Sequence, residues 1–498
     1  MASIVTTPDY DTTLATADRR RTGTWYTPAA LVAHVVARTI GTVTAGQTVR
    51  MLDPACGDGR FLRHAAAYVR AQGGVPELTG VDIDLAGIRG FVRATADEPI
   101  EAIEAIEADS LRYDWANRSF DVVIGNPPFL NQLATATTRV GGSGFGGGTY
   151  ADAAADFLAL SVRLARSDGG RIGLILPVSI LTTRDAGPIR RSVGAMANIE
   201  WFWWSPEPVF EASVRTCAVG MSRHRHPTAV SRTEGIEFQP RPALPLADAV
   251  TATSNDHWGW LIADSLGLPP VPRLSTDGIL ADRALVTANF RDQYYGLVGA
   301  VSDETNGPPL ITTGLIDIAT CHWGERTTRF AKQQFQAPRV DRTNLAPFMQ
   351  RWADRCLVPK VLVATQTRVI EAVVDDSGEW LPAVPVVRVV PMSQTNVWDV
   401  HADLWAIAAV LTSPVASAVI AAQSVGSGLS SATVRVSQRT LGLLPWPHHD
   451  VSAASAALRS GDVETCGRLI DAAYGVEDEA LFSWWLRGVN HQRMASGS

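Results

Sequence analysis

The residues Asn126-Pro127-Pro128-Phe129 are of types that could activate a poorly nucleophilic nitrogen, and they directly follow the apolar, strand-like run Phe120–Ile124. The exocyclic amine of adenine is such a nitrogen, because its lone pair is delocalised into the ring. The side-chain oxygen of Asn126 and the carbonyl oxygen of Pro127 could accept both amine hydrogens and aim the lone pair at an electrophile. The prolines fix the backbone, and Phe129 offers a flat face on which the base could stack.

These four residues also occur in ordinary turns, so their meaning depends on the segments that precede them. The segment 53–62 (DPACGDGRFL) leaves a predicted strand, makes a glycine turn and enters a predicted helix. Glycines there let a ligand approach the backbone, and a helix N-terminus favours polar groups. Asp82, at the end of the next predicted strand, could accept both hydroxyls of a ribose. The dinucleotide pattern GxGxxG is absent, which favours a nucleoside cofactor.

In their order, these segments resemble the amino-methyltransferase family of DNA methyltransferases. The resemblance is to the group of adenine-N6 enzymes whose cofactor region precedes the catalytic motif and a target recognition domain, and it covers roughly residues 20–225. It implies an α/β, Rossmann-like class I methyltransferase domain with S-adenosyl-L-methionine as cofactor. Family members often have Tyr where Phe129 stands, and Phe keeps the stacking face.

The resemblance also implies site residues. The segment 23–32 (GTWYTPAALV) matches the motif that folds over the methionine end of the cofactor. Positions that match the cofactor motifs are Tyr26, Thr27, Pro28, Asp53, Ala55, Cys56, Gly57, Gly59, Asp82, Ile83, Asp109 and Ser110. Asn126, Pro127, Pro128 and Phe129 match the catalytic motif. Phe210 matches loosely the aromatic that helps to hold a flipped base, and a core role for it is equally compatible with the sequence.

The chain is long enough for two domains and a tail. Strand-like and helix-like segments alternate over residues 1–225, which predicts a mostly parallel sheet with helices on both faces. Residues 226–450 contain short β-like runs and are expected to form a mixed, β-rich target recognition domain. Residues 451–498 are expected to form a helical tail. The glycine-rich segment 141–148 is expected to be a loop.

The predicted second domain carries a basic stretch, although the net charge of the whole chain is −7. Residues 326–368 contain nine basic and two acidic residues, and a local basic face is sufficient to bind phosphates. The candidates for contacts to phosphate or guanine are Arg339, Arg342, Arg351, Arg355 and Arg368. For any single arginine, a solvated surface position is the competing interpretation.

The composition limits the classes of protein to which this chain could belong. Apolar residues make up 46% and charged residues 19%, which is typical of a folded chain. The five cysteines form no CxxC pair, so neither a zinc site nor a disulfide framework is expected. No secretory signal is visible at the start and no apolar run reaches about 20 residues, so a cytoplasmic protein without a membrane partner is expected.

Three functions remain open at the level of sequence. The first is modification of adenine in duplex DNA by base flipping, as part of a restriction-modification or phage-defence system whose cleaving activity lies on a separate subunit. The second is methylation of RNA or of a protein glutamine by the same NPPF chemistry, which the large C-terminal domain disfavours. The third is a non-catalytic DNA-binding subunit, which the intact NPPF and cofactor loop disfavour.

Overall fold

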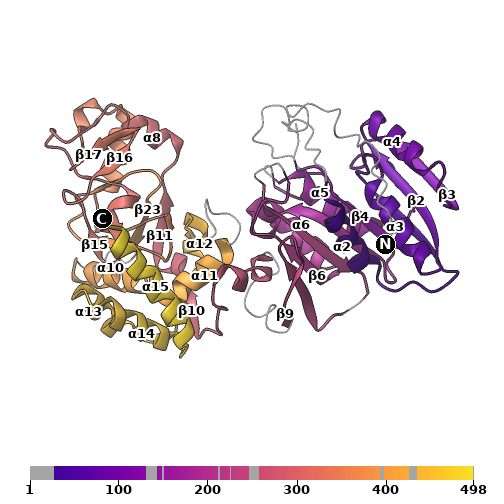
Figure 1. The fold of residues 1–498 in the computed structure, drawn as a ribbon. Coiled ribbons are helices and arrows are strands. Elements are labelled where there is room, and N and C mark those ends of the chain that lie inside the picture. Colours follow the sequence, from indigo (N-terminus) through magenta and orange to yellow (C-terminus); the bar gives the residue numbers. More distant parts are fainter. Residues whose placement is uncertain are drawn as a thin grey trace. The chain divides into compact units, whose positions relative to one another are not determined.

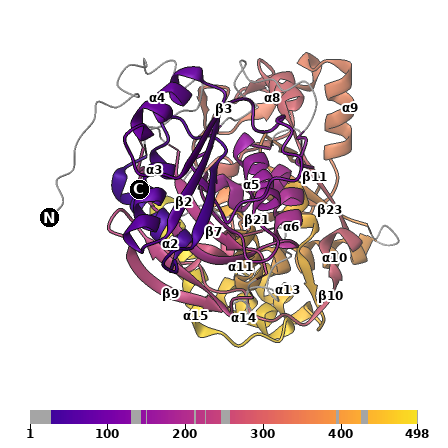
Figure 2. The same cartoon turned by 90° about the vertical axis from the view of Figure 1, so that its right-hand side faces the viewer.

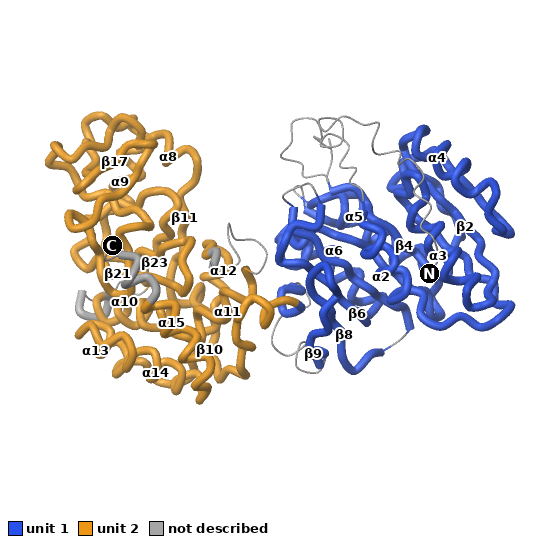
Figure 3. Tube along the Cα trace, in the orientation of Figure 1, with its two compact units in different colours: residues 1–261 blue, residues 262–498 orange. Residues whose placement is uncertain are grey.

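The computed structural model describes residues 27–129, 143–148, 151–210, 214–224, 226–245, 257–392, 397–424 and 434–496. The chain divides into two compact units, Met1–Leu261 and Ile262–Ser498 (Figure 3). Each unit has its own hydrophobic core.

Unit 1 is built on a nine-stranded sheet with the order β3-β2-β1-β4-β5-β7-β6-β8-β9 (Figure 1). Its strands are β1 Thr48–Asp53, β2 Val75–Asp82, β3 Ala102–Glu107, β4 Val122–Gly125, β5 Arg171–Pro177, β6 Asn198–Trp204, β7 Thr216–Ser222, β8 Ala229–Glu234 and β9 Gln239–Pro245. The first five strands are parallel, and β7 runs antiparallel between β5 and β6. This topology confirms the predicted Rossmann-like class I methyltransferase fold.

The helices of unit 1 are α2 Ala29–Ile40, α3 Arg60–Ala71, α4 Leu85–Thr95, α5 Ala153–Leu164 and α6 Gly187–Gly194. The apolar residues of α3 recur on one helical face, which packs with α2 against the sheet. Helix α5 packs against β4 and β5 and is buried at every position except Arg163. The predicted loop is described only over residues 143–148, where it consists of turns and irregular backbone.

The boundary between the units lies later than predicted. Residue 225 falls between β7 and β8, yet β8 pairs in parallel with β6 and β9 pairs with β8, so both strands extend the first sheet. β8 has only two buried positions, and β9 is mostly exposed and contains prolines, so neither reads as a buried apolar run in the sequence.

Unit 2 contains a four-stranded antiparallel sheet, β11-β23-β19-β21, and a group of helices. Its strands are β10 Thr276–Ile279, β11 Ala284–Ala288, β12 Val301–Ser302, β13 Leu310–Ile311, β14 Ile316–Asp317, β15 Thr320–Cys321, β16 Thr328–Phe330, β17 Gln333–Phe335, β18 Arg339–Val340, β19 Lys360–Val363, β20 Gln366–Thr367, β21 Ala372–Asp375, β22 Leu381–Pro382, β23 Val387–Pro391, β24 Val434–Arg435 and β25 Pro445–Pro447. Its helices are α8 Arg291–Leu297, α9 Pro347–Cys356, α10 Val397–Leu411, α11 Pro414–Ser424, α12 Gln438–Gly442, α13 Ser452–Arg459, α14 Val463–Ala473 and α15 Glu479–Ser496.

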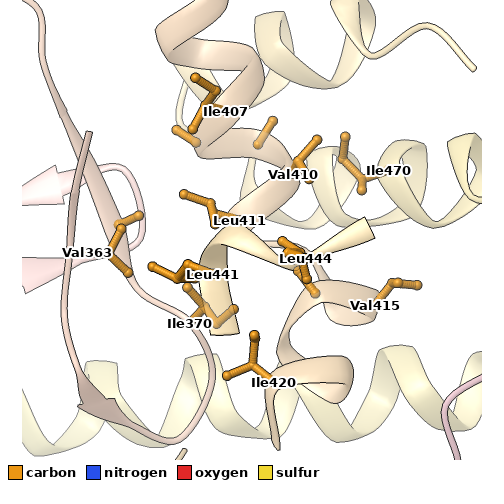
Figure 4. Close-up of a cluster of buried hydrophobic side chains, with 14 of the residues drawn as sticks. Val363, Ile370, Ile407, Val410, Leu411, Val415, Ile420, Leu441, Leu444 and Ile470 are labelled. Carbon is orange, nitrogen blue, oxygen red and sulfur yellow. The ribbon is translucent and has the colours of Figure 1, made fainter. Parts of the chain in front are cut away.

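The main core of unit 2 joins the sheet to these helices. Val363 and Ile370 from the sheet region meet Ile407 of α10, Ile420 of α11 and Ile470 of α14 (Figure 4). Helices α13, α14 and α15 contribute to this core, so the segment predicted as a tail is helical but belongs to unit 2. Within the described residues, no single helix is long and apolar enough to cross a membrane.

A second, smaller core in unit 2 supports what we call the hairpin lobe, which consists of α8, α9 and the hairpin β16–β17 (Figures 1 and 3). Leu297 of α8, Phe330 and Phe335 of the hairpin, and Met349 and Trp352 of α9 are buried together in it. This lobe holds four of the nine basic residues of the stretch predicted to contact DNA, Arg329, Lys332, Arg351 and Arg355.

Candidate active site at the carboxyl edge of the first sheet

The cofactor loop and the NPPF motif leave neighbouring parallel strands at the same edge of the sheet. β1 ends at Asp53, and β4, its neighbour, ends at Gly125 directly before Asn126. The strand order reverses between β1 and β4, which is where ligands bind in open α/β sheets. A Cβ added to Gly125 would lie 2.4 Å from Asp53 Oδ1, so the carboxyl group of Asp53 lies against the backbone of β4. The two predicted motifs therefore form one site.

Within the part of the chain that the structure describes, the side-chain amide of Asn126 is hydrogen-bonded through its nitrogen but not through its oxygen. Its Nδ2 donates a hydrogen bond to Thr27 Oγ1 at 3.0 Å. Its Oδ1 is buried and has no hydrogen-bond partner among the described residues. Leaving a buried acceptor unsatisfied costs about 1–3 kcal/mol, so this oxygen is suited to receive a donor from a ligand. Thr27 was predicted as a cofactor residue, and its contact with Asn126 was not anticipated.

The aromatic residues predicted to hold a base belong to one apolar cluster. Pro127 is buried, whereas Pro128 and Phe129 are half-buried beside it. Phe129 packs against the cluster on the α2–α3 face of the sheet, and Phe210 is a buried member of that cluster. The structure brings the two aromatic residues into one cluster, and the burial of Phe210 equally suits the core role that the sequence left open.

The cofactor loop takes a backbone conformation that requires glycine. Gly57 has a φ of 50° and Gly59 a φ of 76°, and both lie in the left-handed region. A Cβ on Gly59 would lie 1.9 Å from the ring of Phe91, so this position has no room for a side chain. Position 59, directly before α3, therefore requires glycine.

Asp82 connects the cofactor loop to the end of β2. Its Oδ2 accepts the N–H of Gly57 at 2.8 Å and its Oδ1 accepts the N–H of Asp84 at 2.9 Å. Each carboxylate oxygen has a further lone pair with which it could accept a ligand hydroxyl. Ile83 follows with 73% of its surface exposed, which is unusual for an isoleucine at the end of a buried strand.

Two acids at this edge are poorly solvated. Burial raises the pKa of Asp53 to about 8, and the charges of Asp82 and Asp58 act in the same direction. Burial also raises the pKa of Asp82. Cys56 is buried in the same loop, and burial raises the pKa of its thiol well above its usual value. A nearby cation would favour the ionised form of the acids, so the site is electrostatically suited to a positively charged ligand.

The remaining predicted cofactor residues take structural contacts. The hydroxyl of Ser110 donates to the carbonyl of Pro54 at 2.6 Å. Asp109 accepts the N–H of Leu111 at 3.0 Å and lies 3.6 Å from the guanidinium of Arg112. Ala55 is half-buried in the loop, and Pro28 immediately precedes α2. Tyr26 lies outside the described residues.

The predicted DNA-contacting arginines divide into two groups. Arg339 donates to the carbonyl of Gly307 at 2.9 Å and covers the ring of Trp323 at 4.5 Å. Arg342 forms an ion pair with Asp354. These two side chains are therefore engaged within the protein.

The second group is exposed. Arg351 and Arg355 lie one turn apart on α9, and Arg368 lies in the loop after β20. Lys360, which contributes to the charge of the basic stretch, is fully buried and paired with Asp375. The basic surface is therefore smaller than the sequence count indicated.

The part of the chain that contains the candidate site matches a known protein family. Residues 12–238 match the family model described as N-6 DNA Methylase. The type II methyltransferase M.TthHB8I from Thermus thermophilus is 36% identical over 114 residues, which make up 23% of this chain and 23% of that protein. The aligned segment thus spans about a quarter of that relative. The residues that match the family model include every candidate site residue of unit 1.

Two solved structures are similar at low identity. The methyltransferase subunit of a type I restriction-modification system from Streptococcus thermophilus gives a TM-score of 0.36 at 23% identity, over 43% of this chain and 50% of that chain. The type IIG restriction endonuclease BpuSI gives a TM-score of 0.40 at 12% identity, over 96% of this chain and 68% of that chain.

Proposed function

We propose that this chain, whose residues 12–238 match the family model described as N-6 DNA Methylase, is a site-specific methyltransferase that acts on N6 of adenine in duplex DNA. The observation that carries the proposal is the state of Asn126, because its Oδ1 is a buried acceptor without a partner among the described residues. It lies beside the conformationally fixed Pro127, at the edge of the sheet where ligands bind.

The residues at this edge fit S-adenosyl-L-methionine. The glycine loop, the carboxylate of Asp82 and the exposed side chain of Ile83 would hold its nucleoside part. The buried carboxyl groups of Asp53 and Asp82 suit its positive charge. When bound, this cofactor supplies a methyl group on a sulfonium centre.

The chain's own residues orient the amine. Asn126 Oδ1 would accept one hydrogen of the adenine amine and the carbonyl of Pro127 the other, which directs the nitrogen lone pair outward. The bond from Asn126 Nδ2 to Thr27 Oγ1 keeps the oxygen facing the ligand. Phe129, which packs against the cluster that contains Phe210, would stack on the base after the base leaves the duplex, at a cost of a few kcal/mol. The displaced amine proton then leaves to solvent.

Unit 2 would supply the recognition of DNA sequence. Its exposed arginines on α9 offer phosphate contacts. We propose a role as the modification component of a restriction-modification or phage-defence system, in which a separate subunit cleaves unmodified DNA.

The decisive experiment incubates the purified protein with unmethylated genomic DNA and S-adenosyl-L-methionine and then maps modified bases by single-molecule sequencing. We expect N6-methyladenine at one recurring sequence. Asn126→Ala should bind the cofactor normally and lose about 100-fold or more in turnover. Near-normal turnover by this variant would refute the assignment of Asn126. Absence of modified adenine, with the cofactor bound, would favour an RNA or protein-glutamine substrate.

A further inference from the structure

The hairpin β16–β17 has a rigid base and an open outer face. Its strands pair as Thr328↔Phe335, Arg329↔Gln334 and Phe330↔Gln333, and Ala331 and Lys332 form the turn with φ values of 48° and 67°. Two consecutive left-handed residues are typical of the tightest hairpin turns. Because side chains alternate along a strand, Thr328, Phe330 and Phe335 face the core of the lobe.

The inner face attaches the hairpin to α8. The ring of Phe330 lies 5.2 Å from that of Tyr294, and Phe335 is buried in the same cluster. The hairpin and α8 lie together at one end of unit 2 (Figure 1). Helix α9 lies next to α8 (Figure 2). The hairpin is therefore a supported ridge of the lobe.

The outer face and the tip carry hydrogen-bonding side chains that are free. Arg329 and Gln334 form the outward cross-strand pair, and Lys332 and Gln333 lie at the tip; all four are exposed. None of the four makes a side-chain hydrogen bond or ion pair with any of the described residues. No acidic residue occurs in the segment 326–340.

This surface suits the base edges of DNA. The major groove of B-form DNA admits a two-stranded β-ribbon. Within it, arginine and lysine pair with the acceptors of guanine, and glutamine pairs with the donor and acceptor of adenine. The hairpin carries these residue types side by side without acids that would repel the phosphates.

We propose that the outer face of the β16–β17 hairpin enters the major groove and reads base edges, with Arg329 and Gln334 as the specificity-determining pair. This proposal rests on the proposed function, since it assumes duplex DNA as the substrate. It assigns a different task to the hairpin than to the exposed arginines of α9, which lie on a helix and would contact phosphates irrespective of sequence.

The test selects bound duplexes from a random pool with the full-length protein, with the double variant Arg329→Ala/Gln334→Ala and with Arg459→Ala. Arg459 is an exposed arginine on α13 for which no ion pair with the described residues is found, so it matches the loss of charge. We expect the parent and the Arg459 variant to select one recurring sequence. The double variant should tolerate other bases at one or two positions, with about 5- to 150-fold less discrimination at each.

Two further measurements make the result decisive. Thermal unfolding should be unchanged in the double variant, because both side chains are exposed. Binding to double-stranded RNA of the selected sequence should be much weaker, because the deep, narrow major groove of A-form RNA excludes a ribbon. The proposal is overturned if the double variant selects the same sequence with the same discrimination, if RNA binds equally well, or if the parent selects no sequence. Methylation of genomic DNA is scored separately, so the proposed activity can stand when the hairpin assignment fails.

Discussion

The side-chain amide of Asn126 makes a single hydrogen bond within the described residues, to Thr27, and this bond determines which way its oxygen points. Thr27→Val removes the hydroxyl at little change in volume, so the amide loses its anchor. We expect turnover to fall roughly fivefold, which corresponds to about 1 kcal/mol for one hydrogen bond. The affinity for the cofactor, measured by calorimetry, should change little. Thr27→Ser should restore turnover, and failure of this rescue would indicate a purely structural role.

Glu371 should make the free energy of unfolding of unit 2 depend on pH. Burial raises its pKa to about 8, and the charge of Asp317 acts in the same direction. The native state therefore keeps this proton up to about pH 8, whereas the unfolded chain releases it near 4.5. Because the native state binds more protons in that window, its free energy of unfolding falls as pH rises through it.

Glu371→Gln removes the titrating group. Its unfolding temperature should exceed that of the parent at pH 8 and match it more closely at pH 5, as measured by differential scanning calorimetry. Glu379→Gln, at an exposed position, should leave both values unchanged. An equal difference between Glu371→Gln and the parent at both pH values would contradict the linkage.

At single positions, the sequence predicted which residues lie at the candidate site, but it did not predict which of them contact one another. Asp82 ends β2 and Asn126 follows β4, and both strands end at one edge of the sheet, so their placement at that edge follows from the order of the motifs. The contact between Thr27 and Asn126 joins residues far apart in the chain and depends on how α2 packs. One feature of the sequence could have indicated the close approach of Asp53 to Gly125. It is the glycine directly before the catalytic motif.

Among the elements, α9 carries the proposed phosphate contacts of unit 2. Arg351 and Arg355 are exposed on one side of the helix, whereas Arg339 and Arg342 are engaged by other residues of the protein. Arg351→Ala/Arg355→Ala should weaken binding to all duplexes alike. The slope of log K against log salt concentration should become shallower by about 1.8 if both side chains contact phosphates. Arg459→Ala, which removes one positive charge from an exposed position of α13, should leave the slope unchanged. An unchanged slope in the double variant would place the DNA elsewhere.

The strands that could be predicted from the sequence are those buried in the parallel part of the first sheet. Strands such as β1, β4 and β5 are buried in a parallel sheet and therefore read as apolar runs. Unit 2 pairs short segments that lie far apart in sequence, such as β13 with β22. Strands of two residues carry no periodicity, so their partners cannot be inferred from the sequence.

For the whole molecule, the important feature is that each unit has its own core. The core of unit 1 lies between its sheet and α2–α3, and that of unit 2 lies between its four-stranded sheet and α10–α15. Because each core is built from residues of one unit, each unit should unfold as its own cooperative transition. The candidate cofactor residues all belong to unit 1.

Calorimetry of the full chain should therefore show two transitions, of which S-adenosyl-L-methionine raises one. At 100 times its dissociation constant, the cofactor should stabilise unit 1 by about 2.7 kcal/mol. Asn126→Ala should retain this shift, because Asn126 is assigned to the base rather than to the cofactor. Glu371→Gln should move the other transition, which identifies it as that of unit 2. A single transition that moves as a whole with cofactor and with Glu371→Gln would mean that the two cores unfold together, so that cofactor binding in unit 1 also stabilises the hairpin lobe of unit 2.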